Sequence, residues 1–200
     1  EDQSHCPFRA FARRRLQAEP LPGASVGLSS AERGALLHSA LYILWGELGD
    51  SRALAALQPE AEERLVGDAV GRALEALPAR RRGGQRAFIE LERQRLQDLI
   101  GEWLAIERSR VEAFDVYRRE EGVQLSLDRL AISLRVDRID QLPDGSLVVI
   151  DYKSGQGSVA DWLGERPAKP QLLLYGIAAP TGAAAVGAVG QQTATVTEWS

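Results

Sequence analysis

Residues 134–155, with the sequence LRVDRIDQLPDGSLVVIDYKSG, have the pattern of a β-hairpin whose second arm ends in charged side chains. Between the two apolar arms lies Pro143-Asp144-Gly145. This tripeptide favours a tight turn, because proline presets φ and glycine accepts the left-handed conformation that closes a three-residue loop. The sequence therefore predicts two antiparallel neighbouring strands joined by a short loop.

The loop sets the register of the hairpin and with it the position of two acidic residues. If Leu142 pairs with Ser146, Asp137 lies opposite Asp151, with Cβ atoms roughly 4.5–5.5 Å apart. Two carboxylates this close repel unless a cation lies between them, and a divalent ion with oxygen ligands suits that position. Lys153 shares a face with Asp151, because strand side chains alternate, so its ammonium can reach an attacking water or a phosphate oxygen. An exposed hairpin with an incidentally acidic face is the alternative, but it leaves the abrupt end of the apolar run before the second carboxylate unexplained.

The composition is that of one globular domain of ordinary size. The chain has 200 residues, of which 44% are hydrophobic and 26% charged, enough for a real core. No apolar run approaches the roughly 18 residues of a membrane span, so we expect no membrane partner. A single cysteine excludes an internal disulfide and fits a cytoplasmic protein. Methionine is absent even at position 1, so we expect the chain to be a piece of a larger protein.

The net charge of −4 argues against a broadly basic surface for non-specific nucleic-acid binding. Arginines are nevertheless clustered near residues 9–15 and 80–86. A protein that binds both a metal ion and a nucleic acid needs acidic and basic groups in separate places, so the overall balance of charge decides little.

Residues 1–110 have mainly helical periodicity. Ser29-x-x-Glu32 is a capping box, and it begins a helix over about 31–48 that places leucines 37, 41, 44 and 48 on one face. Further helices are expected over 51–78 and 86–108. For the last of these we expect Glu92 and Glu107 to be surface charges. Its apolar face is expected to consist of Phe88, Leu91, Leu99, Trp103 and Ile106.

From residue 111 to about 190 the pattern favours a sheet. Residues 114–120 and 123–127 are expected to form two separate strands, followed by the hairpin, a helix beginning near Lys169, and a further strand over 184–189. We therefore expect one domain over residues 1–200 with an α/β fold, in which a mixed central β-sheet is flanked by helices and the N-terminal half is helical.

The motifs RVDRID at 135–140 and VIDYKSG at 149–155 resemble the signature of the PD-(D/E)XK nuclease superfamily. More narrowly, they resemble the RecB/AddB-type exonuclease domains of bacterial recombination and repair machines. The resemblance covers about residues 6–178 and implies a restriction-endonuclease-like core. In it, Asp137 matches the first acidic motif, and Asp151 with Lys153 matches the D-x-K.

The resemblance also implies residues upstream of the hairpin. RGALLH at 33–38 is similar to an R-G-x-x-x-H motif, with Arg33 toward the substrate and His38 at the metal. From the residues of this helix alone, a core histidine beside leucines is the favoured interpretation of His38. The downstream residues Asp137, Asp151 and Lys153 reverse that preference. Family members carry a glutamate near the end of the strand that resembles residues 114–120. Glu120 is the better match and Glu121 the alternative, and a plain surface residue is the competing interpretation of Glu120.

Downstream of the hairpin, Gln171 and Tyr175 are similar to a Q-x-x-x-Y motif that helps to hold DNA or the catalytic lysine. Their i, i+4 spacing places them on one helix face, and a plain amphipathic helix is the alternative.

Arg135 departs from the family, where glycine is usual, so we expect its side chain to narrow the approach to the metal.

Residues 6–8, CPF, resemble an AddB-type opening whose cysteine is the first ligand of an iron–sulfur cluster. A 4Fe-4S cluster cannot be built from Cys6 alone, because the sequence contains no second thiolate. We therefore expect a free thiol within these residues.

Together these features predict a metal-dependent, exonuclease-like deoxyribonuclease that acts in DNA repair or recombination. Asp137, Asp151 and the backbone carbonyl of Tyr152 would hold one or two Mg²⁺ or Mn²⁺ ions, with His38 completing the ligands. Lys153 would orient the attacking water or stabilise the transition state.

The expected substrate is DNA that is single-stranded or has a free end, and a helicase subunit or domain is a possible partner. Two alternatives stay open: a non-catalytic DNA-binding module of a helicase–nuclease assembly, and a structural domain with an incidental acidic hairpin. The sequence contains no P-loop motif, so any ATPase would be on other parts or other chains.

Overall fold

The computed structural model describes residues 6–18, 27–78, 86–127, 130–152, 183–189 and 194–199. Its helices are α2 (Pro7–Arg14), α3 (Ser30–Leu48), α4 (Ser51–Ala56), α5 (Pro59–Glu75) and α7 (Arg86–Ser109). Its strands are β1 (Asp115–Leu127), β2 (Leu130–Gln141), β3 (Leu147–Ile150), β4 (Ala183–Val189) and β5 (Ala194–Trp199). No helix in these described ranges combines the length and apolarity that a bilayer crossing requires.

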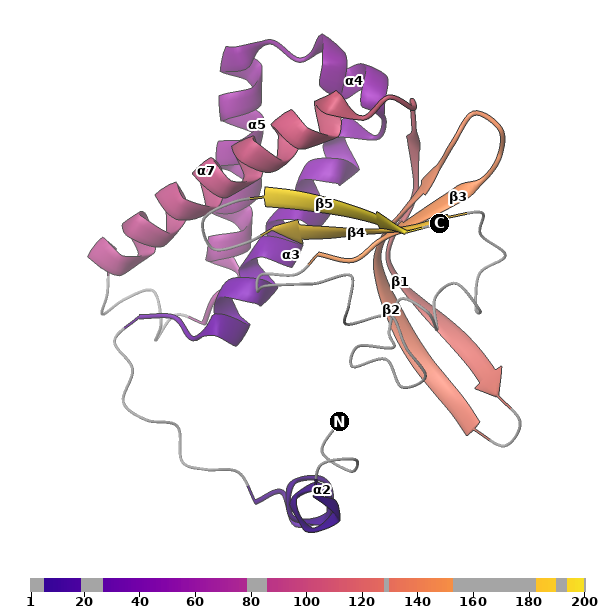
Figure 1. Cartoon of the computed structure of the whole chain (residues 1–200). Helices are drawn as coiled ribbons and strands as arrows, with labels where there is room; N and C mark the ends of the chain where they lie inside the picture. Colours follow the sequence, from indigo (N-terminus) through magenta and orange to yellow (C-terminus); the bar gives the residue numbers. More distant parts are fainter. Residues whose placement is uncertain are drawn as a thin grey trace.

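The strands form one sheet in the order β1-β2-β3-β4-β5. β3 and β4 run parallel and the other neighbours antiparallel, so the expected mixed sheet is confirmed. In Figure 1, α3, α5 and α7 pack together beside this sheet, and β1 and β2 extend away from them as a long twisted ribbon. The fold is mixed α/β, as a restriction-endonuclease-like PD-(D/E)XK core requires.

Helix α3 is the central element of the helical half. It begins at the predicted capping box: the amide of Ser29 donates to the Glu32 carboxylate at 2.8 Å, and the Ser29 hydroxyl accepts from the amide of Glu32. Its leucines 37, 41, 44 and 48 are all buried, as predicted. Tertiary burial of this face gives α3 a fixed position, and the helix also contacts β1 and β2 of the sheet.

Helix α7 buries the C-terminal part of the face that was expected to be apolar: Leu99 and Trp103 are buried, as predicted, and Ile106 is partly buried. Leu91 is 68% exposed and Phe88 41% exposed, whereas Leu96, Ile100 and Leu104 have no exposed surface. The expectation that Glu92 and Glu107 are surface charges was wrong, because both are buried. The helix packs against α4 and α5 and also against β5, so more of its circumference is covered than an amphipathic stripe suggests.

The segment 115–127 is one continuous strand, β1, where two strands were expected. Its pairing with β2 shifts register between Val116 and Arg118, and Glu120 has a φ of 50°. A positive φ is rare for a residue with a side chain and re-aims the residues around it. The irregularity therefore lies within the strand and does not divide it.

The hairpin between β2 and β3 has the predicted register. Leu142 donates its amide to the carbonyl of Ser146 at 2.9 Å, and the ladder continues to the pair Arg138 and Ile150. Gly145 has a φ of 86°, as the turn requires. The strand expected over 184–189 corresponds to β4, whereas β5 was not predicted from the sequence.

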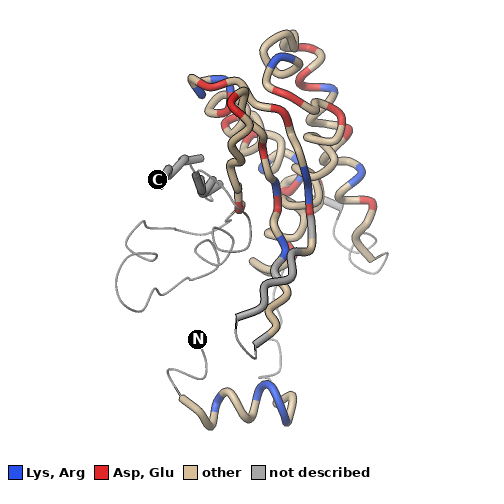
Figure 2. The backbone as a smooth tube through the Cα atoms, turned by 90° about the vertical axis from the view of Figure 1, so that its right-hand side faces the viewer, with Lys and Arg blue, Asp and Glu red and all other residues tan. Residues whose placement is uncertain are grey.

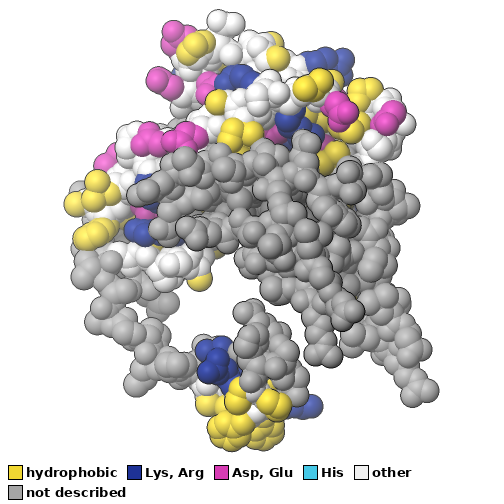
Figure 3. All heavy atoms as spheres, viewed as in Figure 1, with side chains coloured by type: hydrophobic (Ala, Val, Ile, Leu, Met, Phe, Trp, Pro, Cys, Tyr) yellow, Lys and Arg dark blue, Asp and Glu magenta, His cyan; other side chains and the backbone are white. Residues whose placement is uncertain are grey.

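Charged side chains are spread over the described helices and strands, and helix α2 carries exposed apolar side chains. In Figure 2, acidic and basic residues are interspersed over the helices and strands. Helix α2 lies apart from the helical layer in Figure 1, and Figure 3 shows a group of apolar side chains at its surface. The exposed apolar side chains of α2 include Phe8 and Phe11. The distribution of charge agrees with the small net charge of the sequence.

Candidate metal centre

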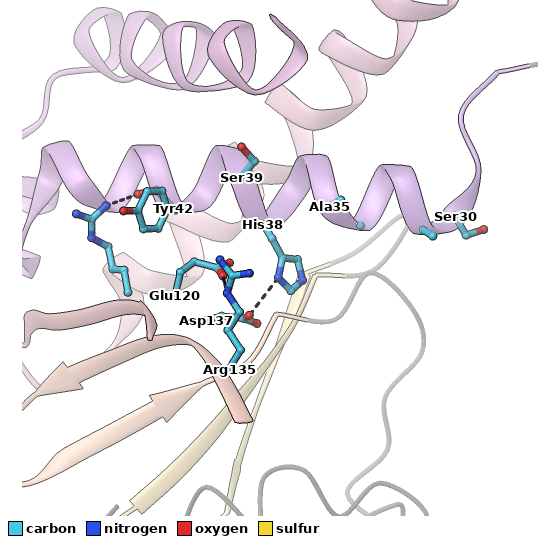
Figure 4. Close-up of a pocket in the computed structure, with 11 residues that line it drawn as sticks. Ser30, Ala35, His38, Ser39, Tyr42, Glu120, Arg135 and Asp137 are labelled. Atoms are coloured by element: carbon cyan, nitrogen blue, oxygen red, sulfur yellow. Dashed lines mark hydrogen bonds and ion pairs between the residues drawn. The ribbon is translucent and has the colours of Figure 1, made fainter. Parts of the chain in front are cut away.

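His38 and Asp137 meet where α3 crosses β2. The imidazole Nδ1 of His38 lies 3.1 Å from Oδ1 of Asp137. Figure 4 shows the ring pointing from α3 toward the strand. The buried leucine face of α3 fixes the rotation of the helix, and this rotation carries His38 to the acidic residue of the hairpin.

The main chain of Tyr152 completes the surroundings of both residues. Its amide donates to Oδ2 of Asp137 at 2.6 Å, and its carbonyl oxygen lies 2.8 Å from Nε2 of His38. The Tyr152 ring is buried and packs edge-on against the His38 ring, with centroids 6.1 Å apart. Tyr152, the second residue beyond the end of β3, therefore fixes the orientation of the Asp137 carboxylate and of the imidazole through its backbone.

Glu120 joins the same group from β1. The flanking pairs, Arg119 with Arg138 and Glu121 with Val136, place Glu120 opposite Asp137 on the neighbouring strand. One ligand atom each from His38, Glu120 and Asp137 lies within 4.8 Å of the other two. Nitrogen and carboxylate oxygen at this separation can coordinate one divalent ion.

The charge around His38 favours its protonated form. Burial lowers the pKa of the imidazole, but the hydrogen bond and negative charge of Asp137, the Tyr152 carbonyl and the charge of Glu120 together raise the pKa above its ordinary value. Both ring nitrogens face oxygen acceptors, which matches an imidazolium that donates twice. A divalent ion bound here would supply positive charge in place of the imidazolium proton. The nitrogen and oxygen donors, together with the negative charge of the two carboxylates, therefore fit a metal site.

Arg135 provides a second positive charge at the same place. Its guanidinium forms an ion pair with the carboxylate of Glu120, and the Arg135 side chain is 72% exposed whereas that of Glu120 is 19% exposed. Figure 4 shows Arg135 beside Asp137 and Glu120. This position agrees with the expectation that an arginine here narrows the approach to the acidic residues.

An open pocket of about 800 Å³ leads to this group. One wall is α3 and the other is formed by β1 and β2 (Figure 4). Besides the three candidate ligands, its lining includes small residues of α3, Tyr42, Arg119 and Arg135. The candidate ligands are therefore accessible from solvent to a ligand of nucleotide size.

A buried cluster of four charges lies directly behind the site. Arg138 is 1% exposed and donates to Glu107 at 2.8 and 3.1 Å and to Asp140 at 2.6 and 2.7 Å. Arg110 donates to the same two carboxylates, at 3.0 and 2.7 Å. Two positive and two negative charges are thus matched, which burial requires.

The cluster is connected to the site through a side chain. Arg138 donates to the hydroxyl of Tyr152 at 3.1 Å, and its guanidinium lies 3.9 Å from the centroid of the Trp45 ring. Burial raises the pKa of Tyr152 well above its ordinary value, so the phenol stays neutral. Tyr152 is therefore held by its side chain on one side and contacts His38 and Asp137 through its backbone on the other.

Several predicted site residues have other positions, or none that can be described. Arg33 does not line the pocket; its Nε donates to the buried carboxylate of Glu92 at 3.0 Å. Asp151 follows β3, one position beyond the last pair of the ladder, Arg138 with Ile150, and is 2% exposed. Lys153, Gln171 and Tyr175 lie outside the described residues.

Other residues of the site were missed by sequence reasoning. Arg138 and Asp140 belong to the strand motif itself, but their burial and their partner Glu107 were not foreseen. The sequence did contain a signal for this cluster. Arg138 and Asp140 are two positions apart and so share one face of the strand, although Asp137 already occupies the other face. Tyr42 and Arg119 gave no signal in the sequence, because only the fold places them at the pocket.

Comparison with known proteins gives a family match. No curated protein matches the sequence at a significant level. Among solved structures, the crystal structure of SSO0001 is similar with 13% identity over 92% of this chain and 71% of that chain, with a TM-score of 0.31. The sequence matches the PD-(D/E)XK nuclease superfamily over residues 1–199. With the His38–Glu120–Asp137 group at its centre, the chain belongs to the PD-(D/E)XK nuclease superfamily.

Proposed function

We propose that residues 1–200 act as one metal-dependent nuclease domain that hydrolyses phosphodiester bonds of DNA. The observation that carries the proposal is the meeting of His38, Glu120 and Asp137 from three separate elements, with ligand atoms within 4.8 Å of one another, at the base of an open pocket. Membership of a nuclease superfamily supports the same reaction class. Convergence of a histidine and two acids in a solvent-accessible pocket is typical of functional sites.

The ligand set that we propose combines the residues of the hairpin with His38. Asp137 and Asp151, the Tyr152 carbonyl and His38 would hold Mg²⁺ or Mn²⁺, and Glu120 is a further ligand. When bound, a divalent ion supplies Lewis-acid activation of water and offsets the charge that develops on the phosphate. Tyr152 orients Asp137 by donating its amide to Oδ2. Neutral or acidic oxygen donors of this kind suit hard divalent ions.

The remaining roles follow from the sequence motifs. Lys153 would orient the attacking water or stabilise the transition state by its positive charge. Gln171 and Tyr175 would position the strand. We further propose an exonuclease-like enzyme of RecB/AddB type, acting in DNA repair or recombination on single strands or free ends, with a helicase subunit or domain as partner.

The decisive experiment measures cleavage of end-labelled linear and circular single-stranded DNA with Mn²⁺ and with a chelator. We expect Mn²⁺-dependent cleavage by the unmodified protein and none by Asp137→Asn. Lys153→Ala should lose cleavage but keep Mn²⁺ and DNA binding, whereas Asp151→Ala should lose Mn²⁺ binding and cleavage together. The labelled circle distinguishes an endonuclease from an exonuclease, since only an endonuclease cleaves it.

Asp144→Asn is the matched control, because Asp144 is an acidic residue of the same hairpin but lies in the exposed turn. It should cleave normally. Undiminished cleavage by Lys153→Ala, with contaminating nuclease excluded, would refute the catalytic assignment. DNA binding without any cleavage by the unmodified protein would favour the non-catalytic module.

A further inference from the structure

Tyr42 is an exposed aromatic residue one helical turn from the candidate metal site. It follows His38 by four residues on α3, so the two side chains lie on the same helix face, separated by about 6 Å along the axis. Tyr42 is 44% exposed and lines the pocket together with His38. Figure 4 shows both side chains on the side of α3 that faces the strands.

Arg119 holds the Tyr42 ring in place. Its guanidinium carbon lies 4.6 Å from the ring centroid, and Nη1 donates to the backbone carbonyl of Tyr42. Gly46 leaves the necessary room, since a Cβ atom there would come within 2.3 Å of that nitrogen. Tyr42 and Arg119 thus form a fixed cation–aromatic pair against α3.

The conformation of Glu120 explains why this pair adjoins the candidate ligands. Neighbouring side chains of a regular strand point to opposite faces, yet Arg119 and Glu120 both line the pocket. The φ of 50° at Glu120 breaks the alternation. Backbone conformations of this strained kind occur most often at active sites and ligand-binding sites. The arginine of the pair and an acid of the metal group are therefore consecutive residues.

We propose that the Tyr42–Arg119 pair is a nucleobase subsite, which stacks an unpaired base of single-stranded DNA whose backbone lies at the metal group. This inference rests on the proposed nuclease function and specifies its substrate. Arg119 covers one face of the Tyr42 ring, so the base stacks on the exposed part of the ring and extends the arginine–tyrosine stack.

The chemistry of stacking selects a single strand. In a duplex both faces of each base are covered by its neighbours, whereas an unpaired base can turn one face to an aromatic ring. Stacking on tyrosine is tolerant of sequence because every base has such a face. The subsite would therefore distinguish strand type and would read no sequence.

The test uses a DNA oligonucleotide that carries the fluorescent base 2-aminopurine, with Ca²⁺ in place of Mn²⁺ so that binding is measured without cleavage. Stacking of this base on tyrosine quenches its fluorescence. We expect quenching on the unmodified protein, retained in Tyr42→Phe and lost in Tyr42→Ala, with affinity for the single strand falling roughly ten-fold. Gly46→Ala should also reduce the quenching, because it displaces Arg119.

Tyr117→Ala is the matched control. Tyr117 is another exposed tyrosine of comparable exposure with an arginine over its ring, 4.8 Å from the Arg118 guanidinium, but it does not line the pocket. It should bind and quench like the unmodified protein. Equal losses in Tyr117→Ala and Tyr42→Ala would overturn the subsite, and so would quenching that Tyr42→Ala leaves intact.

The comparison of substrates separates this inference from the proposed function. Duplex DNA of the same sequence should give little quenching, and an equal or larger effect with duplex or with RNA would overturn the assignment to single-stranded DNA. Cleavage that persists while Tyr42→Ala quenches normally refutes the subsite alone. Quenching that depends on Tyr42 in a protein that never cleaves refutes the nuclease alone.

Discussion

The Nδ1 atom of His38 on α3 lies 3.1 Å from Oδ1 of Asp137 on β2, although 99 positions separate the two residues. The other ring nitrogen faces the carbonyl of Tyr152 at 2.8 Å. The hairpin thus engages both nitrogens of a histidine supplied by the helical half. This contact makes the helix and the hairpin one site.

Replacement of His38 by alanine should weaken metal binding without unfolding the protein. The variant loses one nitrogen ligand and two hydrogen bonds, so we expect Mn²⁺ affinity to fall roughly ten-fold or more and cleavage to slow. The free energy of unfolding should fall by only about 1–3 kcal/mol. Calorimetric Mn²⁺ titration and urea denaturation in chelator measure the two effects. Normal cleavage combined with a lower melting temperature would identify His38 as a core residue.

The stability of the metal-free protein should depend on the protonation of His38. Its folded-state pKa is raised, because the hydrogen bond and charge of Asp137, aided by Tyr152 and Glu120, outweigh burial, which lowers it. The contribution is complete below the ordinary histidine pKa of about 6.5 and is lost as pH rises through the folded-state pKa. Urea denaturation in chelator should show the unmodified protein losing its advantage over His38→Asn in this window. A constant difference between the two proteins would contradict the assignment.

Arg138 should be far more important for stability than an exposed arginine. Arg138→Met leaves Glu107 and Asp140 buried with only Arg110 as their partner, so we expect a loss of about 3–5 kcal/mol in the free energy of unfolding. Arg52→Met is the control, since the pair of Arg52 with Asp115 is exposed at 81% and 66% and should cost less than about 1 kcal/mol. Urea denaturation of both variants measures the difference. Similar values for the two would show that the buried cluster is not a structural requirement.

Arg135 should compete with the metal for Glu120. Because its guanidinium neutralises that carboxylate, Arg135→Ala makes the pocket more negative and should increase Mn²⁺ affinity several-fold at low ionic strength. Arg135→Lys retains the charge and should remain close to the unmodified protein. Calorimetric titration compares the three proteins. Weaker Mn²⁺ binding by Arg135→Ala would show instead that the arginine supports the ligand arrangement.

The sequence determined the parts of this protein that depend on neighbouring residues. The register of Asp137 was predictable because the loop at Gly145 fixes it through interactions within a few positions. The start of α3 at Ser29 was predictable for the same reason, since the capping box closes over three residues. The helical periodicity of residues 30–48 likewise identified the buried leucine face.

Tertiary structure decided which distant groups complete the site. Glu120 has a left-handed conformation within β1, which pairs with β2 on both sides of this residue. No glycine or other turn residue at this position predicts that conformation from the sequence. Arg138 is buried only because Glu107, 31 positions earlier on α7, supplies a matching charge at 2.8 Å. The physical reason is the range of the interactions: turns and caps are closed by local hydrogen bonds, whereas buried charges and ligand groups are stabilised by partners that only the packed chain brings together.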